Sequence, residues 1–470
     1  MPPERRLALL VAACFFMEML DGTIVTTAAP SIGRSLDVPS TSISLVITAY
    51  LVTLAVLIPA SGWVAARYGA RPVFLAAIVV FTAASIGCAS AGSLPVLVAM
   101  RIVQGIGGAL MVPVGRQVVL ADTPKEDLMR VISFLVWPAL VAPVFAPLLG
   151  GVITDYASWH WIFLVNVPFG ALAFVAALRL LPSTPPAGAP PLDRRGVLLT
   201  FLGLGGITYA ADLLAQPAPR WALATTLVVV AVLLLFAAVR HLLGTAAPLI
   251  NLRTLEVRTF RASIGGSAIF WLVVGAVPFV LPLLFQEVFG WSAVKSGAVV
   301  VLLFVGNIAA KPATTFLYGR FGFRAMLVTA TAGLAVSLIL LAFVDAGTWL
   351  AVTGLLVLLG GAARSVGLTG YTTLAFSDVP EHQMPDANIL QVTTQQLCSG
   401  LGAAAGAVAL RLGHTFDSDL DGSFFIAFLL LAGVCLTATI AATRLDRSAG
   451  DVLRTRHQPA TDARGAGSSG

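Results

Sequence analysis

The sequence predicts an all-α integral membrane protein, and two of its features lead to that fold class. The chain has 470 residues, of which 58% are hydrophobic and only 11% charged, and its mean hydropathy is +0.94. Soluble globular proteins carry about 25% charged residues. The apolar residues also occur in runs of about 20, the length that crosses a bilayer as a helix. We therefore expect lipid to cover most of the surface.

Fourteen apolar runs reach the length of a membrane-spanning helix. Six of them precede a proline-rich segment, two follow it directly, and six more complete the chain. The expected spans are residues 7–29, 42–66, 73–91, 95–115, 130–154, 161–182, 196–214, 221–240, 259–286, 296–318, 324–344, 348–372, 387–410 and 422–443.

The basic residues predict the orientation of these spans. Lys and Arg accumulate in short cytoplasmic loops. If the N-terminus is cytoplasmic, 21 of the 28 Lys and Arg residues flank the cytoplasmic face, and 4 flank the outer face. The other three lie inside spans. Both termini are therefore expected in the cytoplasm.

Two loops repeat the same pattern, Arg-aromatic-Gly-x-Arg. One loop, 67–71, follows the second span, and the other, 320–324, follows the tenth. Because both loops hold equivalent cytoplasmic positions, they predict two related six-helix halves with two helices inserted between them. Paired halves that enclose a site near the midplane are the architecture of alternating-access carriers.

These observations predict five segments. We expect an N-terminal six-helix bundle over 1–182, a proline-rich linker over 183–195, two extra helices and a cytoplasmic loop over 196–258, a C-terminal six-helix bundle over 259–443, and a disordered cytoplasmic tail over 444–470.

Four motifs carry a resemblance to a known family. They are residues 20–25 (LDGTIV) with Pro30, residues 101–109 (RIVQGIGGA), residues 143–151 (PVFAPLLGG), and residues 158–163 (SWHWIF) with Asn166 and Pro168. In these the chain resembles the major facilitator superfamily, in its fourteen-helix drug:proton antiporter group. Bacterial multidrug-resistance-type transporters are the most similar members.

The resemblance implies a set of residues for conformational gating. Two positions depart from the family pattern. Ala66 stands where the loop motif usually has an Asp that helps to hold the two halves together in one state, so this contact is weakened or replaced. Ala142 stands where Gly is usual. The implied gating residues are Gly62, Arg67, Gly69, Arg71, Pro143, Pro147, Gly150, Gly151, Arg320, Gly322 and Arg324.

Ionisable residues at membrane depth are costly and mark functional sites. At about 1.5 Å per residue, Glu18 lies roughly 16 Å and Asp21 roughly 21 Å below the first face, and Arg101 lies roughly 9 Å from the other face. In a hydrocarbon core about 30 Å thick, Asp21 and Arg101 therefore lie at the same depth. We expect Asp21 and Glu18 to exchange protons, with Arg101 tuning them. The alternative is a static buried ion pair.

Other polar residues in the spans are candidates for binding a substrate. Lys311 and Arg364 either face a cavity or extend to the inner surface, and in the first case they favour an anionic or zwitterionic substrate. Glu18 favours a cationic one. The expected substrate-binding residues are Glu18, Asp21, Gln104, Asn307, Lys311, Arg364, Gln391 and Gln395.

The leading hypothesis is proton-coupled export of small lipophilic, cationic compounds. Uptake or export of an anionic or zwitterionic metabolite is the alternative. No Gly-Lys of a Walker motif and no metal-binding spacing occurs in the sequence, so we expect neither an enzyme nor a pump driven by ATP. The predicted partners are the substrate, protons and membrane lipids. We expect no metal, no cofactor and no nucleic acid, and a monomer in the bacterial inner membrane.

Overall fold

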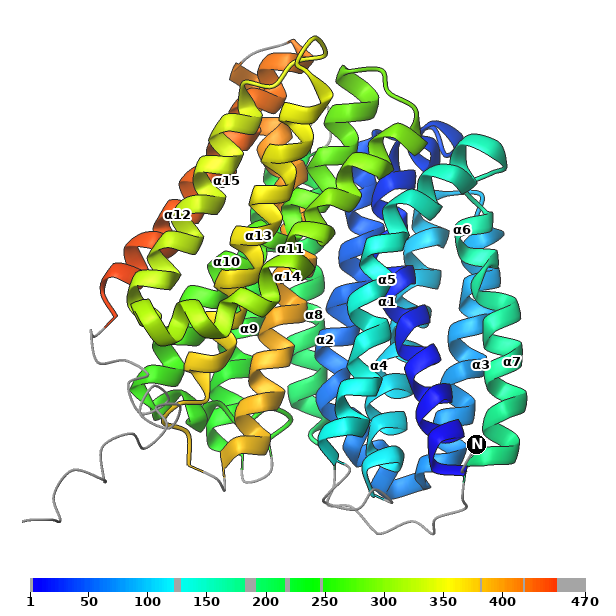
Figure 1. The fold of residues 1–470 in the computed structure, drawn as a ribbon. Helices are drawn as coiled ribbons and strands as arrows, with labels where there is room; N and C mark the ends of the chain where they lie inside the picture. The colour runs from blue at the N-terminus through cyan, green and yellow to red at the C-terminus, as the bar shows by residue number, and fades with distance from the viewer. Residues whose placement is uncertain are drawn as a thin grey trace, which may run out of the picture.

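The computed structural model describes residues 3–121, 128–181, 192–215, 220–245, 248–380, 383–416 and 419–445. In these ranges the chain forms helices joined by loops and turns and contains no strand. The expected linker and tail lie largely outside these ranges. Two groups of long helices stand side by side (Figure 1), one from each end of the sequence.

The N-terminal group begins with the long helix α1, which continues six residues beyond the expected end of the first span. A short helix, α6, leads almost directly into α7. The helices are α1 (Pro3–Ser35), α2 (Ile43–Tyr68), α3 (Ala70–Ala89), α4 (Leu94–Ala121), α5 (Leu128–Tyr156), α6 (Trp161–Leu164) and α7 (Asn166–Leu180).

The C-terminal group has the same order of long helices. Its first helix ends in a π-helical turn, η3 (Leu284–Val288). The long helices are α10 (Arg258–Leu283), α11 (Ala293–Phe321), α12 (Phe323–Ala342), α13 (Leu350–Ala375), α14 (Met384–Phe416) and α15 (Leu420–Thr443).

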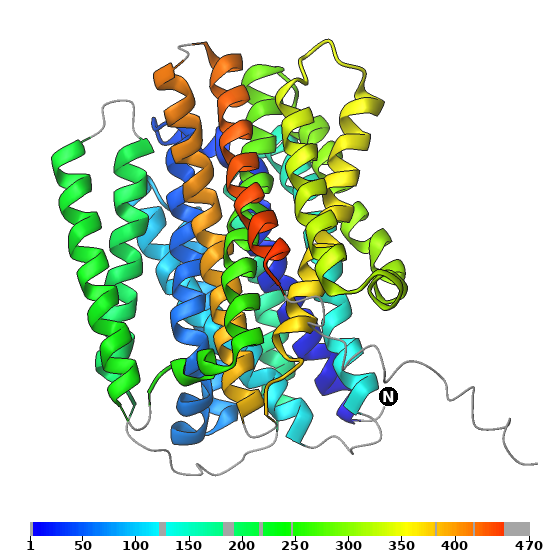
Figure 2. The ribbon, with the colours of Figure 1, turned by 90° about the vertical axis from the view of Figure 1, so that its left-hand side faces the viewer.

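Two helices lie outside both groups. Helix α8 (Arg194–Ala215) packs against α2 and α14, and α9 (Trp221–Gly244) packs against α8. Figure 2 shows this pair along one side of the molecule, next to α2 and α14. Only 17% of the apolar window of α9 is buried within the protein, so this helix leaves most of its surface for lipid.

Twelve helices of the described chain are long and apolar enough to cross a membrane. Two of the fourteen expected spans are absent from this set. Side chains 128–140 of α5 are outside the described part, and the described remainder, Val141–Tyr156, counts as a shorter apolar helix. Asn, Gln and Thr residues lower the hydropathy of α14. The count of fourteen therefore stays a prediction.

The two repeated loops have matching backbones. Gly69, between α2 and α3, has φ 90° and ψ 141°, and Gly322, between α11 and α12, has φ 80° and ψ 164°. Both amides bond back into the preceding helix, to Ala65 O (2.8 Å) and Tyr318 O (3.0 Å). Because such a positive φ favours glycine, the shared glycine has a structural reason in each half.

Candidate functional site

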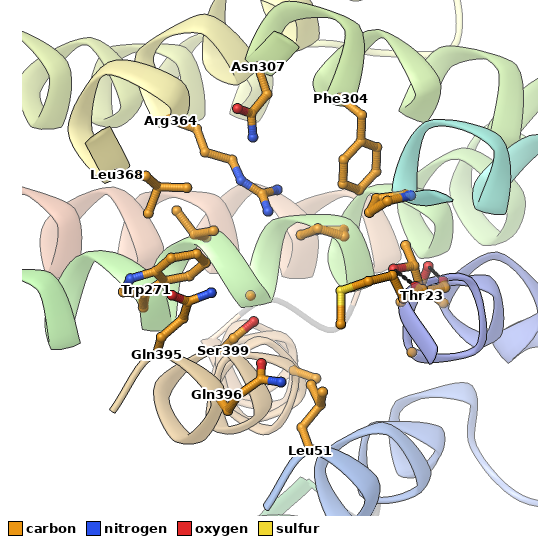
Figure 3. Close-up of a pocket in the computed structure, with 18 of the residues that line it drawn as sticks. Thr23, Leu51, Trp271, Phe304, Asn307, Arg364, Leu368, Gln395, Gln396 and Ser399 are labelled. Atoms are coloured by element: carbon orange, nitrogen blue, oxygen red, sulfur yellow. Dashed lines mark hydrogen bonds between the residues drawn. The ribbon is translucent and has the colours of Figure 1, made fainter. Parts of the chain in front are cut away.

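A cavity of about 480 Å³ lies between the two groups of helices. Side chains from α1, α2 and α5 form its N-terminal wall, and side chains from α10, α11, α13 and α14 form its C-terminal wall (Figure 3). Small-molecule sites have volumes of about 300–1,000 Å³. The charged residues that line the cavity are Glu18, Lys311 and Arg364.

Glu18 is the acidic residue of the N-terminal wall. Glu18 is only 3% exposed, and its Oε2 atom is buried without a hydrogen-bond partner in the described part of the chain. The α1 residues Thr23 and Thr26 lie on the same wall, but their hydroxyls donate to the carbonyls of Met19 (2.9 Å) and Thr23 (2.7 Å). Glu18 is thus the group of this wall best placed to receive a proton or a cation.

Asp21 lies behind that wall, in a buried network of four helices. Its Oδ2 accepts a hydrogen bond from Arg101 Nη1 at 2.5 Å. Its Oδ1 accepts from Gln104 Nε2 (2.9 Å) and Asn166 Nδ2 (2.7 Å). Gln104 also donates to Ser85 Oγ at 2.8 Å. The structure thus brings together Asp21 and Arg101, as their equal depth predicts.

Arg101 is fully buried and is held on several sides. Besides Asp21, it contacts Gln104 Oε1 (2.8 Å) and Val46 O (3.4 Å). Its guanidinium lies 4.1 Å from the centre of the Tyr50 ring, and Tyr50 also lines the cavity. Tyr50 therefore touches both the buried ion pair and the cavity.

The structure adds residues that the sequence did not single out as a site. Asn166 stands in the SWHWIF motif region, but nothing in that motif showed that its amide reaches Asp21. Ser85 had no signal at all. The aromatic cavity residues Trp271, Phe279 and Phe304 read in the sequence as ordinary apolar residues of a membrane helix.

Three expected substrate-binding residues do not line the cavity. Asp21 and Gln104 are 1% and 0% exposed and turn their polar atoms toward each other. Gln391 is 7% exposed and is absent from the cavity wall. For Asp21 the reason is its direction around the axis of α1. Residues three apart point in directions that differ by about 60°, so Glu18 faces the cavity while Asp21 faces α4.

Apart from Glu18, the remaining expected substrate-binding residues line the C-terminal wall. Asn307 and Lys311 come from α11, Arg364 from α13 and Gln395 from α14. In Figure 3, Arg364 extends its guanidinium into the space between Trp271 and Phe304. The Nε and Nη1 atoms of Arg364 are buried and have no hydrogen-bond partner in the described chain.

The two groups touch at the end of the molecule where α1 stops and α11 begins, which we name the closed end. Asp155, at the end of α5, accepts hydrogen bonds from the amides of Ala293 (3.2 Å) and Val294 (2.8 Å) at the start of α11. Gln286 Nε2 donates to Thr27 O at 2.9 Å. The two halves are therefore joined by hydrogen bonds here.

The expected gating motif of α5 lies at this contact. Pro147 and Gly151 pack so closely on α11 that a Cβ atom on Gly151 would collide with the Ala293 carbonyl. Gly150 packs on α1 in the same way, against Ile24 O, and Pro143 lines the cavity. The motif thus connects the cavity wall with the closed end.

The gating residues of the two repeated loops lie at the other end of the helices. Arg71 donates to Leu178 O at the end of α7 (2.8 Å), within its own half. Arg67 and Arg320 are exposed, Arg324 is half-buried, and the exposed Gly62 has open space around it. No contact between the halves is recorded for the described atoms of Arg67, Arg320 or Arg324.

Comparisons with known proteins agree with this geometry. A model of the major facilitator superfamily matches residues 11–403 and 264–463. The putative multidrug resistance protein MdtD of Klebsiella pneumoniae subsp. pneumoniae is 35% identical over 460 residues, which cover 96% of this chain and 97% of that protein. MdtD of Escherichia coli O157:H7 is 35% identical over 416 residues, 88% of each chain.

Solved structures share the fold at low identity. A crystal structure of a D-xylose-proton symporter superposes with a TM-score of 0.66 and 15% identity, over 95% of this chain and 98% of that one. The relatives are transport proteins, which confirms the expectation that the chain is not an enzyme. With the apolar helices, the bacterial relatives support a multi-pass protein of the inner membrane.

Proposed function

Because the chain belongs to the major facilitator superfamily, a family of membrane transporters, we propose that it exports small lipophilic compounds in exchange for protons. Proton exchange is assigned to Glu18 and Asp21, and Arg101 tunes it. The energy source is the proton gradient, and the mechanism needs no cofactor or metal. The name of the MdtD relatives, multidrug resistance protein, supports export as the direction.

One observation carries this proposal. A carboxylate without a hydrogen-bond partner, Glu18, faces the cavity one helical turn from a buried carboxylate–arginine pair. Tyr50 touches both the pair and the cavity. A substrate that binds the wall can thus shift Tyr50 and Arg101, and with them the proton affinity of the two carboxylates.

We propose that alternating access requires opening of the closed end. Opening must break the bonds from Ala293 and Val294 to Asp155 and the bond from Gln286 to Thr27. In the proposed topology all fourteen spans cross the membrane, α8 and α9 are the inserted pair, and both termini are cytoplasmic. The closed end then faces outward. We further propose that the transporter works as a monomer surrounded by membrane lipids.

A second candidate function is transport of an anionic or zwitterionic metabolite. Lys311 and Arg364 favour it, because two of the three charged residues that the structure describes on the cavity wall are basic. Cationic compounds are favoured by Glu18 alone.

Proton movement in proteoliposomes tests the proposal. Two probes with a common dansyl ring, the cation dansylcadaverine and the anion dansylglycine, are applied to vesicles that contain a pH-sensitive dye. We expect at least one probe to drive proton movement and Asp21→Asn to slow it at least about tenfold. Asp345→Asn, in an exposed loop, is the matched control. No proton movement with either probe, or full activity of Asp21→Asn, would contradict the proposal.

A further inference from the structure

Arg364 holds an unusual position for a membrane-buried arginine. It projects from α13 into the cavity (Figure 3), and its guanidinium carbon lies 5.4 Å from the centre of the Phe304 ring. Two of its nitrogens, Nε and Nη1, are buried, and no described residue accepts a hydrogen bond from them. Arg364 forms no salt bridge with a described residue.

A buried cation without a partner is costly, so it is retained where a ligand supplies the partner. A guanidinium offers a planar fork of N–H donors that matches the two oxygens of a carboxylate. The neighbouring wall adds further donors, the ammonium of Lys311 and the amide of Asn307, both on α11. The charge and the donors of the C-terminal wall therefore suit an anionic group.

The rest of the cavity suits an apolar, aromatic body. Trp271, Phe279 and Phe304 lie on the C-terminal wall, and Met19 and Leu51 lie on the wall opposite. The guanidinium of Arg364 lies beside the Phe304 ring, and Trp271 is part of the same wall. A ligand whose carboxylate reaches Arg364 would thus have an aromatic wall next to its attachment point.

We infer that Arg364 is a carboxylate subsite, and that the substrates of this transporter are apolar aromatic compounds that bear a carboxylate. Zwitterions belong to this class, because Glu18 on the opposite wall can bind their cationic group. This inference rests on the proposed transport function, whose second candidate it favours. Lys311 and Asn307 orient the bound anion.

Binding to the purified full-length protein tests the subsite. The probes are dansylglycine, dansylcadaverine and the uncharged dansylamide, and the readout is their fluorescence on binding. In the wild-type protein, dansylglycine binds more tightly than dansylamide. Arg364→Gln weakens dansylglycine at least about tenfold and leaves dansylamide within twofold. Arg364→Lys, which keeps the charge but loses the fork, gives an intermediate affinity for dansylglycine.

The outcomes separate this inference from the proposed function. Equal affinity of wild-type protein and Arg364→Gln for dansylglycine would overturn the subsite, even if Asp21→Asn abolishes proton movement. Arg364-dependent binding without any coupled proton movement would retain the subsite and overturn antiport. Inorganic phosphate that displaces dansylglycine as well as unlabelled N-acetyltryptophan does would show a general anion site, and would contradict an amphiphilic substrate. Unchanged dansylamide binding verifies that each variant is folded.

Discussion

Each half of the molecule contains one arginine deep within its helices, and the two have opposite surroundings. Arg101 in α4 is fully buried and bonds to Asp21, Gln104 and the Val46 carbonyl, and of its three nitrogens only Nη2 has no hydrogen-bond partner in the described chain. Arg364 in α13 faces the cavity, and two of its nitrogens have no hydrogen-bond partner in the described chain. Asp21 of the same half neutralises the first cation, whereas no salt bridge joins the second to a described acidic residue.

This difference suggests that the two halves have different roles at one cavity, proton exchange and ligand binding. The N-terminal half holds a fixed charge pair beside the cavity carboxylate Glu18, which suits proton exchange. The C-terminal half offers unsatisfied donors, which suit a ligand. A static pair at Asp21 and Arg101, without any role in coupling, would also fit the hydrogen bonds of the network. Substitutions are therefore needed to distinguish the two arginines.

The largest expected effect follows from removing the buried pair's cation. Arg101→Leu leaves the Asp21 carboxylate buried with only the amides of Gln104 and Asn166 as donors. Breaking a buried ion pair from one side costs about 3–5 kcal/mol. We therefore expect a clear fall in the melting temperature of Arg101→Leu in detergent.

The same substitution in the other half is the matched control. Arg364→Leu removes a cation that has no salt-bridge partner among the described residues, so the stability of the ligand-free protein stays the same or rises by up to about 2 kcal/mol. The melting temperatures of both variants are measured side by side. A large loss of stability in Arg364→Leu, or none in Arg101→Leu, would break the contrast between the two arginines.

A smaller effect is expected for an acidic residue at the edge of the membrane, where water is close. Asp193, at the start of α8, accepts hydrogen bonds from the amides of Gly196 (2.8 Å) and Leu249 (3.1 Å) and contacts His241 Nε2 (2.7 Å). Burial raises the pKa of Asp193, but these bonds outweigh it and hold the pKa below its ordinary value.

The sign of the pH dependence follows from that lowered pKa. The stabilisation by Asp193 is present above about pH 4, the ordinary pKa of Asp, and is lost as the pH falls through the lower pKa of the folded state. We expect Asp193→Asn to lower the melting temperature by about 1–3 °C at pH 7, and by less at pH 3. An equal difference at both values would mean that hydrogen bonding to the ionised carboxylate is not the cause.

Much of the fold followed from the sequence because lipid imposes simple rules on it. Apolar runs of fixed length gave the helices, and the repeated Arg-aromatic-Gly-x-Arg loops gave the relation between the halves, which the matching backbones of Gly69 and Gly322 support. Depth counting placed Asp21 level with Arg101, because every residue of a helix adds the same rise. These predictions depend on position along a helix axis.

The rest depended on the direction of side chains around that axis and on long-range contacts. Whether Glu18 or Asp21 faces the cavity is decided by a rotation of about 60°, which depth counting cannot supply. The Asn166–Asp21 bond joins residues 145 positions apart, and no local pattern encodes it. That no described acidic residue forms a salt bridge with Arg364 likewise became visible only when the neighbouring helices were in place.

The release of protons on ligand binding tests the central claim most directly. Purified protein in a weakly buffered solution with a pH-sensitive dye is mixed with dansylglycine, dansylcadaverine or dansylamide. If substrate and proton compete, the probe that binds must also release protons from the protein. Glu18→Gln and Asp21→Asn must then reduce the number of protons released per probe molecule bound. Saturable binding without any proton release, or an undiminished release from both variants, would contradict proton exchange through these carboxylates.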